Sequence, residues 1–468
     1  MLAVGREINV KSVFQTDWLA SNPVFYNEKT GKASHNINDV IDYTNLELHP
    51  EGFNNYLDFG YSVFEQTPVR HVKFLRHSSR LWVDEQGALS VEYLDDPVEQ
   101  WLDYRLSEED IIDLIRERVQ AWEHSVEGEV VIPTSGGYDS RLLNWCVEDK
   151  SRVRSFTYGV SENQAEYYEV VYARRLSELL GTRWEQIPLG DFHQYFDDWD
   201  RLFGVSTHAH GMYHIEFYHK ILPKVEGGNP FLSGIIGDAW AGSVNIAPLE
   251  KRTDVKRLGY AHGMEADSAQ SKYAVDLSLF TNYWETHRDR LEDTRFRVVE
   301  AMRFKIVLLC YLRSVPEYFG FKWWSPFLDV DLAMAMLNLP PERKRDRVWQ
   351  KEFFQKVGLG LESMNLQAVY NGTLNLQALR RIPVKPLDVN LLREVMRPHY
   401  VERINRTLLH QSSGWAERLL GRLLHVRKVG GALRRLGFTD KVSRQNEAYN
   451  AYLVLLPVKK LLRRRNQG

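Results

Sequence analysis

Apolar residues between positions 130 and 189 alternate between short continuous runs and longer segments with helical spacing. The runs at 130–132, 153–158 and 184–189 predict strands, and the segments 141–148 and 165–180 predict helices between them. The second helix has one apolar face and a glycine at its C-cap position; these residues are Tyr172, Leu176, Leu179, Leu180 and Gly181. Alternation of strands and helices favours an α/β fold with a doubly wound parallel sheet.

The chain before this region has the pattern of short strands and turns. The apolar runs at 54–61 and 69–75 contain β-favouring residues, and 84–87 suits a turn between strands at 80–83 and 89–93. Ser107, with Asp110 three residues later, is a plausible N-cap for a helix that continues through Val119.

After about residue 245 the pattern is mainly helical. We therefore predict three parts: a small β-rich N-terminal domain at 1–105, an α/β domain at 106–390 and a basic helical C-terminal region at 391–468.

Composition narrows the class of protein. The chain has 468 residues, of which 44% are hydrophobic and 26% are charged, which is typical of globular domains and not of disordered chains. Its two cysteines cannot form a disulfide framework or a cysteine-ligated metal site within one chain. The sequence has no apolar run of membrane-spanning length and no signal-peptide pattern at its N-terminus, so we expect a soluble, cytoplasmic protein.

Charge is unevenly distributed along the chain. The net charge of −2 predicts no nucleic-acid partner, yet the segment from Arg418 to Gly468 carries a charge of +11. Within it, residues 448–465 combine tyrosines and leucines with lysines and arginines, although Pro457 interrupts the pattern. This composition permits weak contact with a membrane surface or a partner, and packing on the rest of the chain is the alternative.

The segment Ser135-Gly136-Gly137-Tyr138-Asp139-Ser140 lies between a predicted strand and a predicted helix. Glycines let a backbone approach a ligand closely, and the amides at a helix N-terminus attract anions. An aspartate in such a loop would repel a bare phosphate unless a divalent cation lay between them. The segment therefore predicts a site for nucleotide phosphates and Mg²⁺; a glycine turn with a structural aspartate is the alternative.

This segment resembles the S-G-G-x-D-S motif of the PP-loop ATP pyrophosphatases. Other segments resemble the asparagine synthetase family within that group. These are the second strand at 155–159, the helix and L-G-T turn at 173–182, the L-S-G-E-G-x-D stretch at 232–238, the P-F-L-D at 326–329, and the end of a truncated glutaminase-like domain at 56–60. The resemblance covers about residues 50 to 390.

The resemblance implies a set of ligand contacts. Pyrophosphate would be held by Ser135, Gly136, Gly137, Asp139 and Ser140; AMP would be bordered by Pro133, Tyr158, Ser233 and Gly234; and Mg²⁺ would be bound by Asp139 and Asp238. The alternative for Asp238 is a helix N-cap. The implied reaction is ATP-dependent amide bond formation through an acyl-adenylate, with a small-molecule carboxylate as one substrate and an amine or ammonia as the other.

The sequence departs from the family at several positions. Residue 2 is leucine where glutamine-dependent members have a nucleophilic cysteine, so we expect no glutaminase activity; the amine would come from free ammonia, a separate ammonia-supplying protein or the substrate itself. Acidic family positions fall on Ile235 and Lys322, and a glycine falls on Ile236. The family's late lysine falls on Gln350 or, with a slip of one residue, Lys351, our candidate catalytic residue; a surface lysine is the alternative. A catalytically degenerate paralogue that binds a nucleotide or a partner is the second hypothesis.

Three histidines, His208, His210 and His214, lie close together in the sequence and permit either a metal site or part of the acyl pocket. Arg141, directly after the loop, is expected either to contact the acyl substrate or to form a surface salt bridge.

Overall fold

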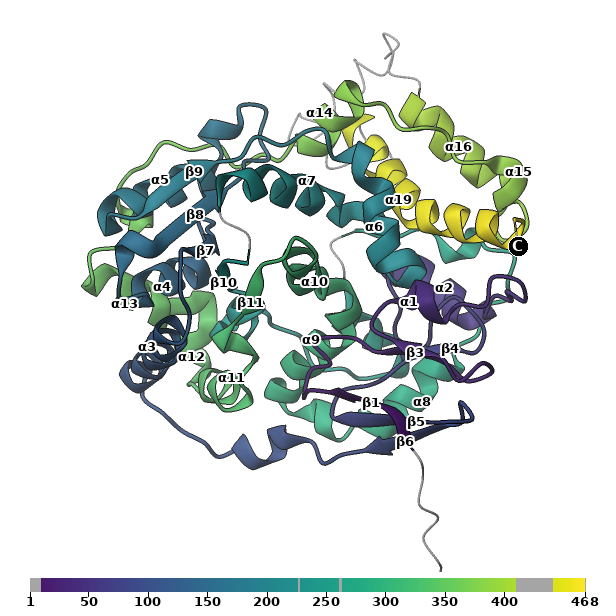
Figure 1. The fold of residues 1–468 in the computed structure, drawn as a ribbon, viewed down its shortest axis with the longest axis horizontal. Helices are drawn as coiled ribbons and strands as arrows, with labels where there is room; N and C mark the ends of the chain where they lie inside the picture. Colours follow the sequence, from purple (N-terminus) through teal and green to yellow (C-terminus); the bar gives the residue numbers. More distant parts are fainter. Residues whose placement is uncertain (1–9, 226–227, 261–262, 410–440, 468) are drawn as a thin grey trace, which may run out of the picture.

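The structure is a computed structural model that describes residues 10–225, 228–260, 263–409 and 441–467. Its centre is a five-stranded, fully parallel sheet with the spatial order β11-β10-β7-β8-β9 (Figure 1). The strands are β7 (Val130–Pro133), β8 (Val153–Thr157), β9 (Arg183–Gln186), β10 (Pro230–Leu232) and β11 (Lys322–Trp324).

Strand β7 lies in the middle of the sheet, where both of its faces are buried. Val130, Val131 and Ile132 are fully buried, as expected for a β-branched run inside a parallel sheet. The three strands predicted between residues 130 and 189 are confirmed. Strand β11 was not foreseen, since its three residues, Lys-Trp-Trp, form no recognisable pattern.

Helices cover both faces of the sheet. One face carries α3 (Glu108–His124), α4 (Tyr138–Cys146) and α5 (Tyr168–Leu180), and the other carries α7 (Met212–Ile221) and α10 (Tyr311–Tyr318) (Figure 1). The ring of Tyr218 in α7, for example, lies 5.8 Å from that of Phe231 in β10. The predicted doubly wound α/β class is therefore confirmed.

Two of the predicted helix ends agree in detail with the structure. Ser107 and Asp110 form a reciprocal capping box at the start of α3. Gly181 ends α5 with a φ of 69°, a left-handed conformation that favours glycine.

The N-terminal part contains two small antiparallel sheets, β1-β5-β6 and β3-β2-β4. Their strands are β1 (Val10–Thr16), β2 (Phe25–Asn27), β3 (Ala33–Ser34), β4 (Val72–Phe74), β5 (Ser79–Asp84) and β6 (Leu89–Tyr93), and the short helix α1 (Ile37–Val40) follows β3. The predicted turn at 84–87 connects β5 to β6.

The predicted strand at 54–61 is wrong, because this segment belongs to helix α2 (Pro50–Phe59). Pro50 stands in the first helical turn, where its missing N–H costs nothing, and Gly60 ends the helix with a φ of 77°. Phe53, Tyr56 and Leu57 are buried at helical spacing, so tertiary packing overrides the β propensity of the aromatic residues.

Helices dominate after β10, as predicted. They are α8 (Ser278–His287), α9 (Thr294–Leu309), α10, α11 (Val330–Leu337), α12 (Pro341–Lys344), α13 (Val348–Lys356), α14 (Leu374–Arg381), α15 (Val389–Leu392), α16 (Pro398–Leu409) and α19 (Lys441–Arg465); α6 (Phe196–Phe203) precedes α7. No helix in the described ranges has both the length and the apolar character needed to cross a bilayer.

Helix α19 packs into the body of the molecule, beside α15 and α16 and near α6 (Figure 1). Tyr56 in α2 donates a hydrogen bond to the Val454 carbonyl over 2.9 Å, and Tyr449 lies 2.7 Å from His193 Nε2. Arg464 pairs with the buried Asp200. Part of the basic segment that begins at Arg418, residues 418–440, lies outside the described residues.

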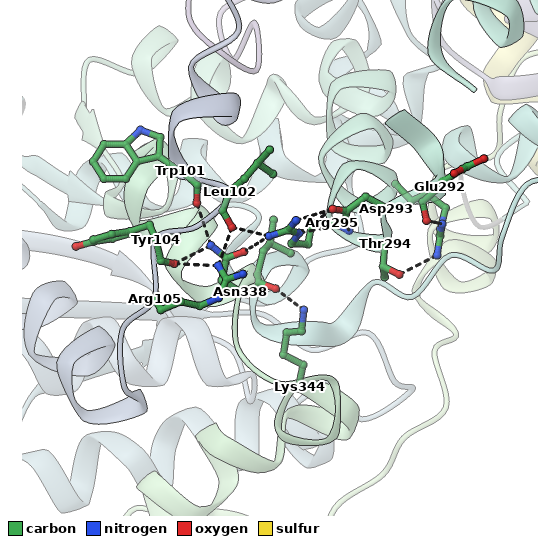
Figure 2. A network of polar contacts seen from close by, with 12 residues as sticks. Trp101, Leu102, Tyr104, Arg105, Glu292, Asp293, Thr294, Arg295, Asn338 and Lys344 are labelled. Carbon is green, nitrogen blue, oxygen red and sulfur yellow. Dashed lines mark hydrogen bonds and ion pairs between the residues drawn. The ribbon is translucent and has the colours of Figure 1, made fainter. Parts of the chain in front are cut away.

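A polar junction fastens the connection between the N-terminal sheets and α3 to the helical part (Figure 2). Asn338, at the end of α11, donates hydrogen bonds to the carbonyls of Trp101 and Tyr104 at 2.9 and 2.7 Å. Its Oδ1 accepts one from Arg295 of α9 at 2.7 Å, and Arg295 also reaches the Leu102 carbonyl at 2.6 Å. The side-chain amide of Asn338 thus connects α11, α9 and the segment 101–104.

We expect Asn338→Ala to lower the free energy of unfolding by about 2 to 4 kcal/mol, because it removes two hydrogen bonds to backbone carbonyls and one from the Arg295 guanidinium. Urea denaturation followed by circular dichroism measures this loss. Asn390→Ala, at an exposed position in α15, is the matched control and should change stability by less than about 0.5 kcal/mol. Equal midpoints for the two variants would contradict the assignment.

Candidate functional site

The carboxyl ends of β7 and β10 meet where the strand order reverses direction. The chain proceeds from β7 to β8 and β9 on one side, then returns to place β10 on the other side of β7. Crevices at such reversal points are the usual ligand sites of open α/β sheets. A cavity of about 390 Å³ lies here, and its lining includes the loop after β7, the ends of β8 and β10, and parts of α7 and α10.

The loop after β7 is organised by its own hydroxyl groups. The Ser140 hydroxyl accepts a hydrogen bond from the Ser135 amide at 3.0 Å, and the Ser135 hydroxyl accepts one from the Gly137 amide at 3.1 Å. Gly137 is the N-cap of α4 and has no capping side chain of its own. The start of α4 therefore presents backbone N–H groups toward the cavity, an arrangement suited to an anion.

Arg141 supports this loop from behind. Its side chain is fully buried, donates a hydrogen bond to the Gly136 carbonyl at 2.9 Å, and pairs with Glu362 at 2.9 Å. Arg141 is thus neither at the cavity nor in an ordinary surface salt bridge, the two roles expected from the sequence. It ties the loop to the segment after α13.

Glycines allow the loop after β10 to approach Asp139. A Cβ added at Gly234 would lie 3.2 Å from the Asp139 Cβ, and one added at Gly237 would lie 3.0 Å from the Asp139 Cγ and 2.9 Å from the Phe327 ring. Any larger residue at position 237 would push the two loops apart. The close approach brings Asp238, which follows Gly237, to the same end of the cavity as Asp139.

The two carboxylates influence each other electrostatically. Burial raises the pKa of Asp139 well above its ordinary value, the charge of Asp238 raises it further, and Arg347 opposes the shift. Asp139 Oδ1 is buried and accepts no hydrogen bond from the described residues. The Gln350 amide lies beside Asp139, but neither of its polar atoms makes a hydrogen bond of normal geometry within the described part of the chain.

These features fit a divalent cation. Two carboxylates on neighbouring loops, one with a buried oxygen that lacks a donor, are the hard oxygen ligands that Mg²⁺ prefers, and phosphate oxygens can complete the set. The Ser243 hydroxyl donates a 2.7 Å hydrogen bond to Asp238 Oδ2, which holds that carboxylate in place.

The inner part of the cavity is aromatic. Its walls are formed by Phe156, Tyr158, His214, Phe217, Tyr218 and Phe231. The rings of Tyr158 and Phe217 pack edge to face at 5.1 Å. Such a surface suits a flat apolar ring, while the loop end of the same cavity suits charge.

Most of the predicted site residues line this cavity: Pro133, Ser135, Gly137, Asp139, Ser140, Tyr158, Ser233, Gly234 and Asp238. Gly136 is buried within the loop, and its carbonyl accepts a hydrogen bond from Arg141. Lys351 is exposed on α13 and is absent from the lining, whereas Arg347, which the sequence did not single out, is part of it.

Two residues that differ from the pattern of the resembling family also line the cavity. Ile235 and Ile236 are both buried there, and Ile236 has a φ of 52°. A β-branched side chain in the left-handed region is strained, and glycine takes this conformation without cost. Lys322, by contrast, is an exposed residue of β11.

His208 and His214 are buried and His210 is partly buried, and all three are held as neutral side chains. Burial lowers the pKa of His208 and His214 to about 3 and that of His210 to about 4. No group of three His, Cys, Asp or Glu side chains among the described residues is placed to hold a metal ion. His214 lines the aromatic part of the cavity, and its buried Nδ1 makes no hydrogen bond with any residue that the structure describes.

No protein-family model and no curated protein matches the chain. Among solved structures, the chain is similar to NH3-dependent NAD synthetase from Campylobacter jejuni subsp. jejuni NCTC 11168 in complex with the nitrate ion. The identity is 13% and the TM-score 0.24, with 44% of this chain and 96% of the other covered. A likeness of this extent carries no inference about this chain.

The buried histidines predict a stability that depends on pH. In the unfolded chain each takes up a proton near pH 6.5, whereas the folded state resists protonation until about pH 4, so their contribution is present above pH 6.5 and is lost as the pH falls. Each should cost about 1.4 kcal/mol per pH unit below pH 6. We expect the fall in unfolding temperature between pH 7.5 and 5.5 to be smaller in His210→Gln than in the wild type.

Thermal unfolding at both pH values gives this difference, which is independent of any overall loss of stability in the variant. His399→Gln is the control, because His399 is exposed on the surface of α16, and the pH dependence of the variant is compared with that of the wild type. An unchanged fall in His210→Gln would show that His210 is not buried in its neutral form.

Proposed function

We propose that this protein is an ATP-dependent, AMP-forming amide ligase without glutaminase activity of its own. It would act on a small-molecule carboxylate, such as a sugar acid or a specialised metabolite, and would join it to an amine or ammonia. One observation carries the proposal: the glycine loop after β7 and the carboxylates Asp139 and Asp238 converge on a single cavity at the point where the strand order reverses.

The cavity has two ends that match the two halves of ATP. The amides around Gly137 and the hydroxyls of Ser135 and Ser140 would bind the phosphates, and the aromatic end beside Tyr158 would hold the adenine ring. Asp139 and Asp238 would hold Mg²⁺, which, when bound, neutralises phosphate charge and links the nucleotide to the two carboxylates.

In the first step, an oxygen of the substrate carboxylate attacks the α-phosphorus of ATP. The bond from that phosphorus to the bridging oxygen of the β-phosphate breaks, and pyrophosphate carries away the negative charge. In the second step, the amine attacks the acyl carbon of the adenylate, loses a proton, and expels AMP. The residues of this chain would contribute mainly by positioning the reactants and by stabilising charge.

The amine would reach the site as free ammonia, from a separate ammonia-supplying protein, or as part of the substrate. Lys351, the catalytic residue predicted from sequence, is exposed on α13. It would take part in this chemistry only if its side chain reached the bound substrate.

The second candidate function is nucleotide or partner binding without turnover. It is favoured by Ile235 and Ile236, which place apolar groups in the cavity where the resembling family has an acidic residue and a glycine. The two functions differ in whether AMP and pyrophosphate are released.

We expect MgATP to bind the wild-type protein saturably and Asp139→Asn to weaken this binding about ten- to hundredfold, the equivalent of losing one interaction between charged groups. Isothermal titration calorimetry measures both constants. Asp289→Asn, which changes a fully exposed carboxylate, is the control and should bind as the wild type does.

A screen of carboxylates for the release of AMP and pyrophosphate then separates the two functions. Release that depends on an added carboxylate supports the ligase, and binding without release by any carboxylate supports the second candidate. If the wild type does not bind MgATP, the proposed function is wrong.

A further inference from the structure

Arg347 stands at the opening of α13 and lines the cavity beside the glycine loop. Its guanidinium carbon lies 4.7 Å from the centre of the Tyr138 ring, and Tyr138 is the residue between Gly137 and Asp139 in that loop. The positive charge of Arg347 also acts on Asp139, which confirms that the guanidinium lies at the charged end of the cavity. The side chain is therefore close to where the phosphates of a bound nucleotide would lie.

Three other cationic side chains in this region have partners of their own. Arg343 pairs with Glu108 and Glu352, Arg141 pairs with Glu362, and Lys344 donates to the Leu337 carbonyl. Within the described ranges, the Arg347 side chain forms neither an ion pair nor a hydrogen bond, although it is only partly exposed. A partly buried guanidinium with five donors and no acceptor is suited to an anionic ligand.

The backbone that presents Arg347 is strained. Asp346 has φ and ψ of 53° and 17°, and Arg347 has 54° and 44°, so two successive residues that are not glycine adopt the left-handed conformation. Such conformations persist only where the surrounding structure imposes them, and they are concentrated at functional sites.

The imposing element is the turn that follows Asp238. A Cβ added at Gly242 would lie 2.3 Å from the Lys344 carbonyl oxygen, so the two segments touch, and Trp349 donates a 3.1 Å hydrogen bond to the Ala241 carbonyl. The segment 239–243 thus fixes the position of Arg347 and also supplies Ser243, which holds Asp238. The segment 239–243 therefore positions both Arg347 and Asp238.

We propose that Arg347 binds the β- and γ-phosphates of the nucleotide, and the pyrophosphate formed from them, through its guanidinium group. The inference rests on the proposed function and adds to it a cationic residue that the sequence pattern did not indicate. A guanidinium presents parallel N–H groups that match two phosphate oxygens, so lysine should replace it only in part.

The test is calorimetric titration of the full chain with MgATP, with inorganic pyrophosphate in the presence of Mg²⁺, and with AMP. We expect Arg347→Ala to weaken the binding of MgATP and of pyrophosphate at least tenfold and to change AMP binding less than about twofold, since AMP lacks the two phosphates. Arg347→Lys should be intermediate. Arg345→Ala removes a matching, exposed side chain two residues earlier and should leave all three affinities unchanged.

Arg347→Gly provides a second readout, because glycine relieves the backbone strain. It should lose pyrophosphate binding as the alanine variant does while its unfolding temperature stays equal to or rises above that of the wild type. A residue that merely supported the fold would show the opposite change in stability. Lys351→Ala tests the rival cation directly.

Wild-type pyrophosphate binding in Arg347→Ala overturns the inference and leaves the proposed function intact, as does a loss confined to Lys351→Ala. Failure of the wild type to bind MgATP overturns both. A tenfold or greater loss for MgATP and pyrophosphate, with AMP binding retained, supports the inference.

Discussion

The contact between the loop after β10 and Asp139 is the constraint on which the rest of the site depends. Gly234 and Gly237 remove the side chains that would otherwise separate the two loops, so Asp238 comes to the end of the cavity where Asp139 already lies. Two carboxylates in a partly buried place repel each other, and their proximity is unfavourable until a cation joins them. The same loop continues into the turn at 239–243, which packs against the Lys344 carbonyl and the segment that connects α12 to α13. The geometry of both sides of the cavity is thus set by how closely two strand ends approach.

Local features of the sequence predicted the part of the site that one continuous segment builds. The β-branched run of β7, the glycines and the start of α4 follow one another in the chain, so hydrophobic pattern and turn chemistry were sufficient to locate the loop. The site residues that follow β10 were predicted only through the family resemblance. About a hundred residues separate β10 from β7, and the three buried residues of β10 do not indicate which strand lies beside it. Helix α2 was mistaken for a strand because aromatic residues favour strands until packing decides otherwise.

Charged residues proved the hardest to assign from sequence. The lysine position implied by the resemblance falls on Gln350 and reaches Lys351 only with a slip of one residue. A helix rotates each successive residue by about 100°, and only the packing of α13 determines which of these two neighbours is buried. Gln350 is fully buried and Lys351 is exposed. Arg347 was not predicted as a site residue because it follows Arg343, Lys344 and Arg345, and a cluster of charged residues is typical of a solvated surface. The strained backbone at this position cannot be recognised from the residue types.

Helix α19 has a consequence for how the polypeptide reaches its native state. Its hydrogen bond to Tyr56 joins positions that are 398 residues apart, and its tyrosines complete the surroundings of His193. During synthesis from the N-terminus, the parts of the segments 204–206 and 209–211 that α19 covers would therefore stay uncovered until residues 441–465 have left the ribosome. Contacts between such distant positions slow folding and prolong the exposure of aggregation-prone intermediates. The hydrogen bond between His193 and Tyr449 is therefore among the last native contacts of this part of the fold to form.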